Sequence, residues 1–284
     1  PAALCGLVGL KPTFGLVSRY GVFPLSWSLD TVGPMTRTVE DSALIMNVIA
    51  GPDLRDTSSS GRDAEDYTAE LGEGVAGTRI GIPKEHFFDV IDDEVRDTVM
   101  RAAGVLEGLG ASVEEVSLPM LDHVSAISGA ILITEAAEVH LDNLRERADL
   151  FDPEVRARLE QGALTPAVQY IKAQRARSAF SRQMLRTMAR VDILLTPTCP
   201  IVAPRIGEQM VAVGDRMDSR NAVLSRLTRP FNLCGNPTIS LPCGSDSQGM
   251  PIGLQLTGRL FDETGLLRVA HTFELAGNGP GAAG

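Results

Sequence analysis

Residues 78–118 alternate between the two periodicities of regular structure, and this alternation limits the fold more than any other feature. The short apolar run TRIGI at 78–82 is closed by a proline and predicts a strand. Apolar residues then recur at helical spacing along 92–109, until Gly110 ends that segment. The stretch SVEEVSL at 112–118 alternates apolar and polar residues and predicts a second strand. A strand, a helix and a strand in this order indicate an α/β layer architecture.

The chain beyond this unit contains further segments with the same two periodicities. Thr38 and Asp41 have the spacing of a helix N-terminal cap, which predicts a helix over 38–50. The apolar run at 191–196 predicts a buried strand. The remaining expected elements are strands at 236–243 and 251–257, mainly helical structure over 121–190 and a last helix at 261–276. The apolar face of the helix at 92–109 consists of Val95, Val99, Ala102, Ala103, Leu106 and Leu109.

Two segments rich in small and polar residues show neither periodicity. Residues 52–75 are expected to form a solvated loop, and residues 277–284 a flexible tail with no core to join.

The composition is that of an ordinary globular protein. The 284 residues are 44% hydrophobic and 22% charged, which is enough apolar material to bury a sizeable core. The net charge of −10 argues against nucleic acid or an anionic membrane as a partner. No uninterrupted apolar run approaches the length that spans a bilayer, so no membrane-spanning segment is expected.

Cysteine and histidine residues are few and scattered. The cysteines, which are Cys5, Cys199, Cys234 and Cys243, have neither C-x-x-C nor metal-finger spacing. The four histidines form no H-x-x-x-H pair. We therefore expect reduced thiols in a cytoplasmic protein, with no metal site and no histidine-based triad. Cys199 as a nucleophile has no visible base, and that role is not expected.

The opening run GLVGLKPT at 6–13 has the residue types of a phosphate-binding loop and the wrong spacing. A Walker loop needs the lysine directly after the last glycine and the hydroxyl directly after the lysine. Here Leu10 separates Gly9 from Lys11, and Pro12 follows the lysine. Since Pro12 has no N–H and biases Lys11 away from helical dihedrals, no phosphate-binding helix can start there.

Four segments spread over the chain carry a stronger pattern when they are read together. They are PAALCGLVGLKPTFGLVSRYGVFPLSWSLDTVGPMTRTVEDSALIMNVIAG, DILLTPTCP, PFNLCGNPTISLPCG and GMPIGLQLTGRLFDETGLLRVAHTFE. In this order they resemble the amidase signature family. The resemblance implies an α/β fold with a mixed β-sheet core flanked by helices, the N-terminal part missing. It also implies that residues 1–276 are the C-terminal portion of a single domain of that family.

The resemblance further implies where the chemistry lies. In the family, PAALCGLVGLKPT follows a G-G-S-x-R-x-P-A motif, which puts the nucleophilic serine about four residues before Pro1. A second serine, in a cis peptide, and a lysine are expected further upstream. The implied reaction is hydrolysis of a carboxylic amide through a serine acyl-enzyme, without metal or organic cofactor. This chain alone is then expected to be inactive, with the glycines after Pro1 as turns and Lys11 as a structural lysine.

The resemblance suggests several site residues within the chain. Asp30 aligns with an aspartate of the network that supports the serine motif, although a turn aspartate is the alternative. Phe23 and Trp27 could line an acyl pocket or pack in the core. Thr198 follows a predicted buried strand, where pocket residues of α/β folds are common.

Arg158 aligns with an arginine that one branch of the family, the A subunit of the glutamyl-tRNA amidotransferase, uses to hold a substrate carboxylate. An exposed helix residue is the alternative. That branch has an aspartate where Ser225 stands here, and its D-G-V-R-Y-G stretch is absent. We therefore expect a stand-alone amidase acting on a small-molecule amide. The glutamine-hydrolysing amidotransferase component and an inactive fragment or binding module remain the alternatives, and a homodimer is left open.

Overall fold

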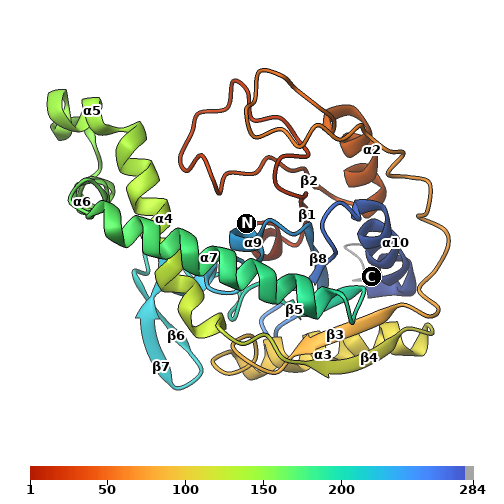
Figure 1. The fold of residues 1–284 in the computed structure, drawn as a ribbon. Coiled ribbons are helices and arrows are strands. Elements are labelled where there is room, and N and C mark those ends of the chain that lie inside the picture. The colour runs from red at the N-terminus through yellow and green to blue at the C-terminus, as the bar shows by residue number, and fades with distance from the viewer. Residues whose placement is uncertain (279–284) are drawn as a thin grey trace.

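Strands from both ends of the sequence form one mixed β-sheet at the centre of the molecule (Figure 1). The computed structural model describes residues 1–278. Within them the sheet consists of β1 (Val8–Lys11), β2 (Met35–Thr36), β3 (Arg79–Pro83), β4 (Ser112–Val116), β5 (Ile193–Pro197), β8 (Thr238–Ser245) and β9 (Pro251–Thr257). The strand order is β2-β1-β8-β9-β5-β3-β4. Neighbours from β2 to β5 are antiparallel, whereas β5, β3 and β4 run parallel to one another. The α/β class with a mixed sheet is confirmed.

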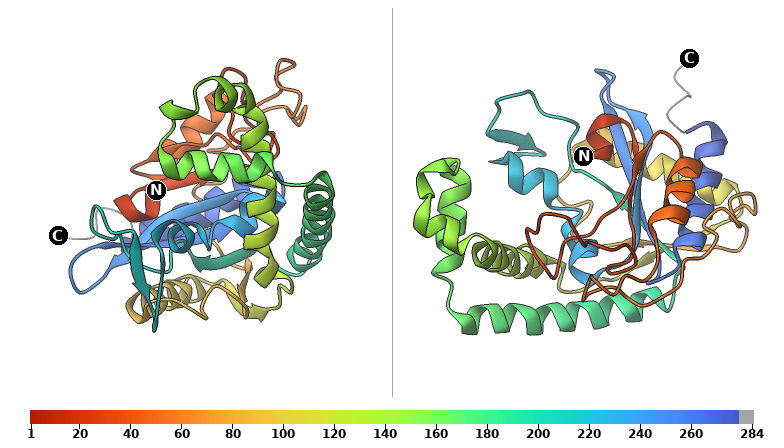
Figure 2. Two further views of the ribbon diagram at one scale, coloured as in Figure 1. Left: turned by 90° about the vertical axis from the view of Figure 1, so that its left-hand side faces the viewer. Right: turned by 90° about the horizontal axis from the view of Figure 1, so that it is seen from above.

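Helices cover both faces of this sheet (Figure 2). The helices are α1 (Ala2–Cys5), α2 (Val39–Ile49), α3 (Asp93–Gly108), α4 (Val124–Val139), α5 (Leu141–Glu146), α6 (Pro153–Ala163), α7 (Ala167–Met188), α8 (Arg220–Ser225), α9 (Arg229–Cys234) and α10 (Glu263–Phe273). Buried residues of α2, α3 and α10 belong to one core cluster, and those of α4, α7 and α9 to another. A separate hairpin of β6 (Met210–Val213) and β7 (Arg216–Ser219) packs near α8.

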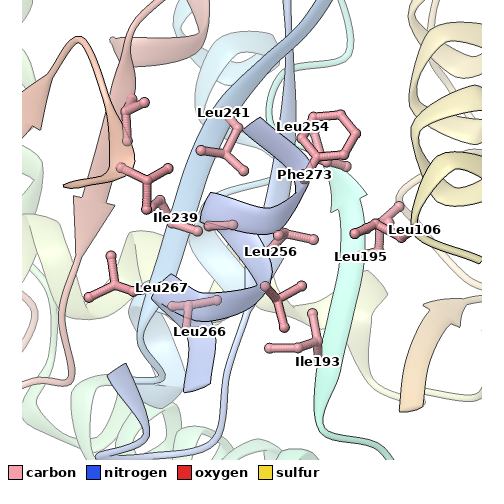
Figure 3. Packing of buried hydrophobic residues seen from close by; sticks show 14 of the residues in the cluster. Leu106, Ile193, Leu195, Ile239, Leu241, Leu254, Leu256, Leu266, Leu267 and Phe273 are labelled. Atoms are coloured by element: carbon pink, nitrogen blue, oxygen red, sulfur yellow. The ribbon is translucent and has the colours of Figure 1, made fainter. Parts of the chain in front are cut away.

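The central strand β5 shows why the sheet needs a helical layer on each side. All of its residues are buried. Ile193 and Leu195 pack in the cluster that contains α3 and α10, while Leu194 packs in the cluster that contains α4 and α7. Successive side chains of a strand point to opposite faces, so a continuous apolar run is stable only between two apolar layers. Figure 3 shows the first of these layers, where side chains of β5, β8 and β9 meet those of α10 and α3.

Most of the expected elements are present. The helix predicted at 38–50 is α2, and the Thr38 hydroxyl accepts a 3.1 Å hydrogen bond from the N–H of Asp41. The strand, helix and strand predicted between 78 and 118 are β3, α3 and β4. The region 121–190 is helical, with breaks next to Pro153 and Pro166, each of which lies at a helix start.

Three details of the prediction are wrong. Leu109 lies just after the end of α3 and is 40% exposed, so it is not part of that helix's buried face. The loop at 52–75 is not simply solvated, because Tyr67, Leu71 and Val75 are buried in the core. Gly9 is not in a turn but in strand β1, where a Cβ atom would lie 2.5 Å from the methyl group of Ala2. Gly6, by contrast, does form a left-handed cap after α1.

The C-terminal residues of the chain are only partly described. Of the flexible tail expected at 277–284, residues 279–284 lie outside the described residues. No helix in the described part of the chain is both long and apolar enough to cross a membrane.

Candidate functional site

A cavity of about 200 Å³ opens beside Pro1, where α1, β1, β8, β9 and α9 meet. Its wall includes Pro1 itself and a set of polar side chains supplied by several elements. These are Lys11, Thr198, Thr228, Thr238, Ser240 and Gln255. The rest of the lining is largely apolar and includes Phe231. An apolar cavity with a few convergent polar groups is the usual form of a small-molecule site.

The polar groups of this cavity, which we call the Pro1 cavity, are joined to one another. The hydroxyls of Thr198 and Ser240 are 2.9 Å apart, and the N–H of Thr198 donates to the carbonyl of Gly253 over 2.9 Å. Gln255 donates from its amide nitrogen to the hydroxyl of Thr196, at 3.0 Å. Because these buried groups are hydrogen-bonded, their orientation is fixed before any ligand arrives. The structure thus places Thr198 in a cavity wall.

Lys11 contributes the charge of the Pro1 cavity. Its ammonium donates a 3.0 Å hydrogen bond to the carbonyl of Pro12. Desolvation lowers the pKa of Lys11 to about 8, with the nearby Cys234 and Glu263 acting in the opposite direction. An amine with this pKa gives up its proton more readily than an exposed lysine does. Lys11 thus lies in the cavity wall, and its expected structural role stays a prediction.

Phe23, Trp27 and Asp30 line a second cavity, of about 430 Å³, in the loop that follows β1. Asp30 accepts hydrogen bonds from the N–H groups of Leu25 and Ser26, at 2.8 and 3.0 Å. These are the contacts of a turn aspartate, which was the alternative role for Asp30, and the turn is part of a cavity wall. The rings of Phe23 and Trp27 are 73% and 59% exposed, so neither packs in the core. We refer to this space as the loop cavity.

Arg158 lies in a third place, on the exposed surface of α6. It forms an ion pair with Glu154 on the same helix, and Glu154 also accepts a 3.2 Å hydrogen bond from Asn221. Ser225 accepts a 2.8 Å hydrogen bond from the guanidinium of Arg229. Arg158 lies close enough to Arg229 for the two positive charges to repel each other. Burial, followed by the charge of Arg158, lowers the pKa of Arg229. The structure therefore brings Arg158 and Ser225 into one polar cluster, and the hydroxyl of Thr228, which lines the Pro1 cavity, donates a 3.2 Å hydrogen bond to the carbonyl of Ser225.

Cys199 directly follows Thr198, a residue of the Pro1 cavity wall, but its buried thiol is not expected to react. Burial raises the pKa of its thiol to about 11, and its Sγ contacts the carbonyl of Leu224 at 3.7 Å. A thiol in this state supplies almost no thiolate at neutral pH. Within residues 1–278, no group of three or more metal-ligating side chains is placed to hold a metal ion.

Sequence reasoning missed Ser240 and Gln255, which form much of the polar wall. They are direct partners in the antiparallel register of β8 and β9. The available signal was a polar residue between two apolar ones in the middle of each strand, at ISL and LQL. Such residues are buried only when they have hydrogen-bond partners, which marks them as candidates for a site.

Known proteins resemble this chain along almost its whole length. A family model described as Amidase matches residues 1–267. An amidase from Pseudomonas putida is 41% identical over 278 residues, covering 97% of this chain and 59% of the relative. The A subunit of glutamyl-tRNA(Gln) amidotransferase from Bacillus mycoides (strain KBAB4) is 40% identical over 301 residues, covering 97% and 61% respectively.

A solved structure agrees with these similarities. It concerns a vestigial protein complex that bears on the evolutionary origins of an s-triazine catabolic enzyme. Its matching chain has a TM-score of 0.94 at 34% identity, covering 98% of this chain and 60% of that one. The present chain thus spans about three fifths of the length of the relatives that it matches. The match of the family model over residues 1–267, the similar relatives and the shared fold show that the chain belongs to the amidase signature family.

Proposed function

We propose that the protein containing this chain hydrolyses a small carboxylic amide to the acid and ammonia or an amine, through a serine acyl-enzyme. In this proposal residues 1–276 are the C-terminal portion of a single catalytic domain. The nucleophilic serine, the cis-peptide serine and the lysine belong to residues that precede Pro1. The described residues then supply substrate contacts and support, and no metal or organic cofactor is needed.

The position of Pro1 in the wall of the Pro1 cavity carries this proposal. A serine about four residues before Pro1 lies within about 14 Å of it, because an extended chain spans at most about 3.6 Å per residue. This proposal puts the attacking hydroxyl no farther than that from a residue of a cavity wall that contains hydrogen-bonded donors and acceptors. An unassisted serine hydroxyl is a poor nucleophile, so the upstream lysine must be neutral to accept its proton. In this arrangement the hydroxyls of Thr198 and Ser240 orient the amide.

The surroundings of Ser225 favour a stand-alone amidase over a glutamine-hydrolysing subunit. Free glutamine carries an ammonium group, which needs an anionic or accepting partner. Ser225 instead accepts a hydrogen bond from the guanidinium of Arg229, beside Arg158. Arg158 is paired with Glu154, and the guanidinium of Arg229 next to Ser225 repels an ammonium and favours an anion or a neutral dipole.

The experiment uses the open reading frame that contains this chain, with the residues encoded before Pro1. Ammonia release is measured on a panel of aliphatic and aromatic carboxamides, with glutamine included. We expect release from at least one carboxamide and a loss of roughly a thousandfold or more when the upstream serine is replaced by alanine. Release that persists without this serine contradicts the proposal. Residues 1–284 expressed alone are expected to release no ammonia.

A second candidate is the glutamine-hydrolysing component of a glutamyl-tRNA amidotransferase. It is favoured by the 40% identity to the Bacillus mycoides amidotransferase protein, close to the 41% found for the amidase. Glutamine hydrolysis above that of every other carboxamide in the panel, with co-purification of the other amidotransferase components, decides for this candidate.

A further inference from the structure

Glu135 is a buried acid on a helix whose other buried residues are mostly apolar. It lies in α4 and is 3% exposed. Moving a carboxylate out of water is costly unless hydrogen bonds or a cation replace the lost hydration. The contacts of Glu135 therefore indicate what this residue does.

Two serines of the loop after β1 meet the Glu135 carboxylate. The hydroxyl of Ser26 donates to one carboxylate oxygen, which also accepts the N–H of Ser28 at 3.1 Å. The hydroxyl of Ser28 donates to the other oxygen at 2.7 Å, and the phenol of Tyr170 on α7 donates to the same oxygen at 2.8 Å. Hydrogen bonds to an ionised acceptor are roughly twice as strong as neutral ones.

A cation completes the network from the opposite side. Arg177 on α7 donates to the hydroxyl of Ser28 at 3.0 Å, to its carbonyl at 2.9 Å and to the carbonyl of Leu233 at 2.7 Å. Burial lowers the pKa of Arg177, and the charge of Glu135 acts against this shift. Ser28 is thus held between a carboxylate and a guanidinium, which belong to two different helices.

The loop held in this way is the one that forms the loop cavity. Ser26 and Ser28 flank Trp27, and Asp30 accepts a hydrogen bond from the N–H of Ser26. The ring of Phe23 lies 5.7 Å from that of His140, which follows the end of α4. The exposed rings of Phe23 and Trp27 therefore stand on a segment that α4 fixes at two points.

We propose that Glu135 is a positioning residue that fixes the segment 23–30 and so sets the shape of the loop cavity. Its effect on substrates rests on the proposed function, whereas its effect on the segment does not. Glu135 acts as the acceptor that joins α4 to the loop and never contacts the substrate. Its loss loosens the segment without removing a reacting group.

The chain contains its own reporter, because Trp27 is its single tryptophan. The test compares Glu135→Gln with Glu138→Gln, which removes an exposed acid from the same helix. Fluorescence anisotropy of Trp27 and tryptic cleavage after Arg19 are measured in the 284-residue chain. Glutamine cannot balance the charge of Arg177, so we expect lower Trp27 anisotropy and roughly tenfold faster cleavage, as loss of one charge-assisted hydrogen bond predicts. Glu138→Gln is expected to change neither.

A second variant keeps the test decisive if Glu135→Gln folds poorly. The double change Ser26→Ala and Ser28→Ala removes the hydroxyl contacts from the loop side and leaves α4 intact. It is expected to lower the anisotropy and speed the cleavage in the same way. Unchanged values in either folded variant overturn the proposal.

In the longer protein, Glu135→Gln is expected to raise KM for the amide about fivefold or more with kcat nearly unchanged, since substrate contacts and not the chemical step are affected. A fall in kcat at constant KM overturns the positioning role. Loss of the proposed amidase activity in the unaltered protein leaves the fluorescence result standing, so the two failures are distinguishable.

Discussion

The backbone N–H of Thr13 donates a 2.7 Å hydrogen bond to the carboxylate of Glu263, joining residues 250 positions apart. The hydroxyl of Thr13 accepts a 2.9 Å hydrogen bond from the N–H of Phe261. Glu263 is 2% exposed, and burial raises the pKa of its carboxyl. The turn after β1 is thus fastened to the start of α10, beside the elements that form the Pro1 cavity.

Replacing Glu263 by alanine is expected to lower the free energy of unfolding by about 1–3 kcal/mol, because the N–H of Thr13 is left buried without its acceptor. Glu263→Gln is expected to cost less, since the amide oxygen can still accept. Urea unfolding measures both changes. The exposed Glu107→Ala serves as the control and is expected to stay within about 0.5 kcal/mol of the unaltered chain. Equal effects of Glu263→Ala and Glu107→Ala contradict the prediction.

Lys11 makes stability depend on pH in a defined direction. Its pKa is about 8 in the folded chain against an ordinary value of 10.5, so between these values the unfolded chain binds the extra proton. The penalty for burying the ammonium is fully present below about pH 8 and is lost as the pH rises towards 10.5. Stability should therefore rise with pH in this window.

Lys11→Met removes the titrating group and isolates its contribution. The difference in unfolding free energy between the unaltered chain and Lys11→Met should shift by about 1 kcal/mol from about pH 7 to about pH 9, in favour of the unaltered chain. Taking the difference at each pH cancels the titration of groups that the two proteins share. A constant difference shows that the Lys11 ammonium is not desolvated.

Gly33 is required by a close approach between backbone segments. A Cβ at this position would lie 1.9 Å from the carbonyl oxygen of Leu10. Gly33→Ala is expected to destabilise the chain by about 3 kcal/mol or more, because backbone rather than a flexible side chain must move. Gly104, in the exposed middle of α3, has open space around it, and Gly104→Ala should stabilise by about 0.5–1 kcal/mol. Thermal melts of both variants check the opposite signs.

The cysteines are expected to differ in reactivity. Cys5 is exposed, whereas burial raises the pKa of Cys199 and Cys234 to about 11 and that of Cys243 to about 12. Iodoacetamide at about pH 7.5 should label Cys5 in the native chain and the other three only after denaturation. Peptide mass spectrometry identifies the labelled thiol. Native labelling of Cys199 contradicts the inert state assigned to it.

Asp30 is expected to act through the turn that it closes. Asp30→Ala leaves the N–H groups of Leu25 and Ser26 without their acceptor, whereas Asp30→Asn retains an oxygen in the same place. Amide hydrolysis by the longer protein should fall about tenfold in kcat/KM for alanine, as expected when about 1.4 kcal/mol is lost, and less for asparagine. A larger loss for asparagine than for alanine indicates that the charge itself, and not the turn, is needed.

The periodic helices and strands could be predicted because the spacing of their apolar residues indicates which positions are buried. The run at 191–196 is apolar almost throughout and contains most of β5, which is covered on both faces. The hairpin of β6 and β7 carries no such pattern, because only Val211 and Val213 point into a small apolar cluster. Short strands with little buried surface are weakly encoded and depend on their neighbours.

In the glycine-rich opening, the local sequence predicts the wrong structure. Local propensity favours a turn at Gly9, yet this residue lies in strand β1. Glycine is needed there because Ala2 of α1 occupies the space that a Cβ atom would fill. The site depends on the same kind of distant packing. Ser240 and Gln255 face each other only through the register of β8 and β9, which no local pattern specifies. Asp30, whose turn contacts are local, was the more predictable residue.

The pairing of β1 with β8 places Gly9 opposite Ser240. During synthesis β1 can pair early with β2, but more than two hundred further residues must leave the ribosome before β8, its neighbour on the other side, exists. Closing such a large loop is entropically slow. Nascent chains of this protein are thus expected to be clients of chaperones until β8 has emerged, with an unpaired apolar edge shielded in the meantime.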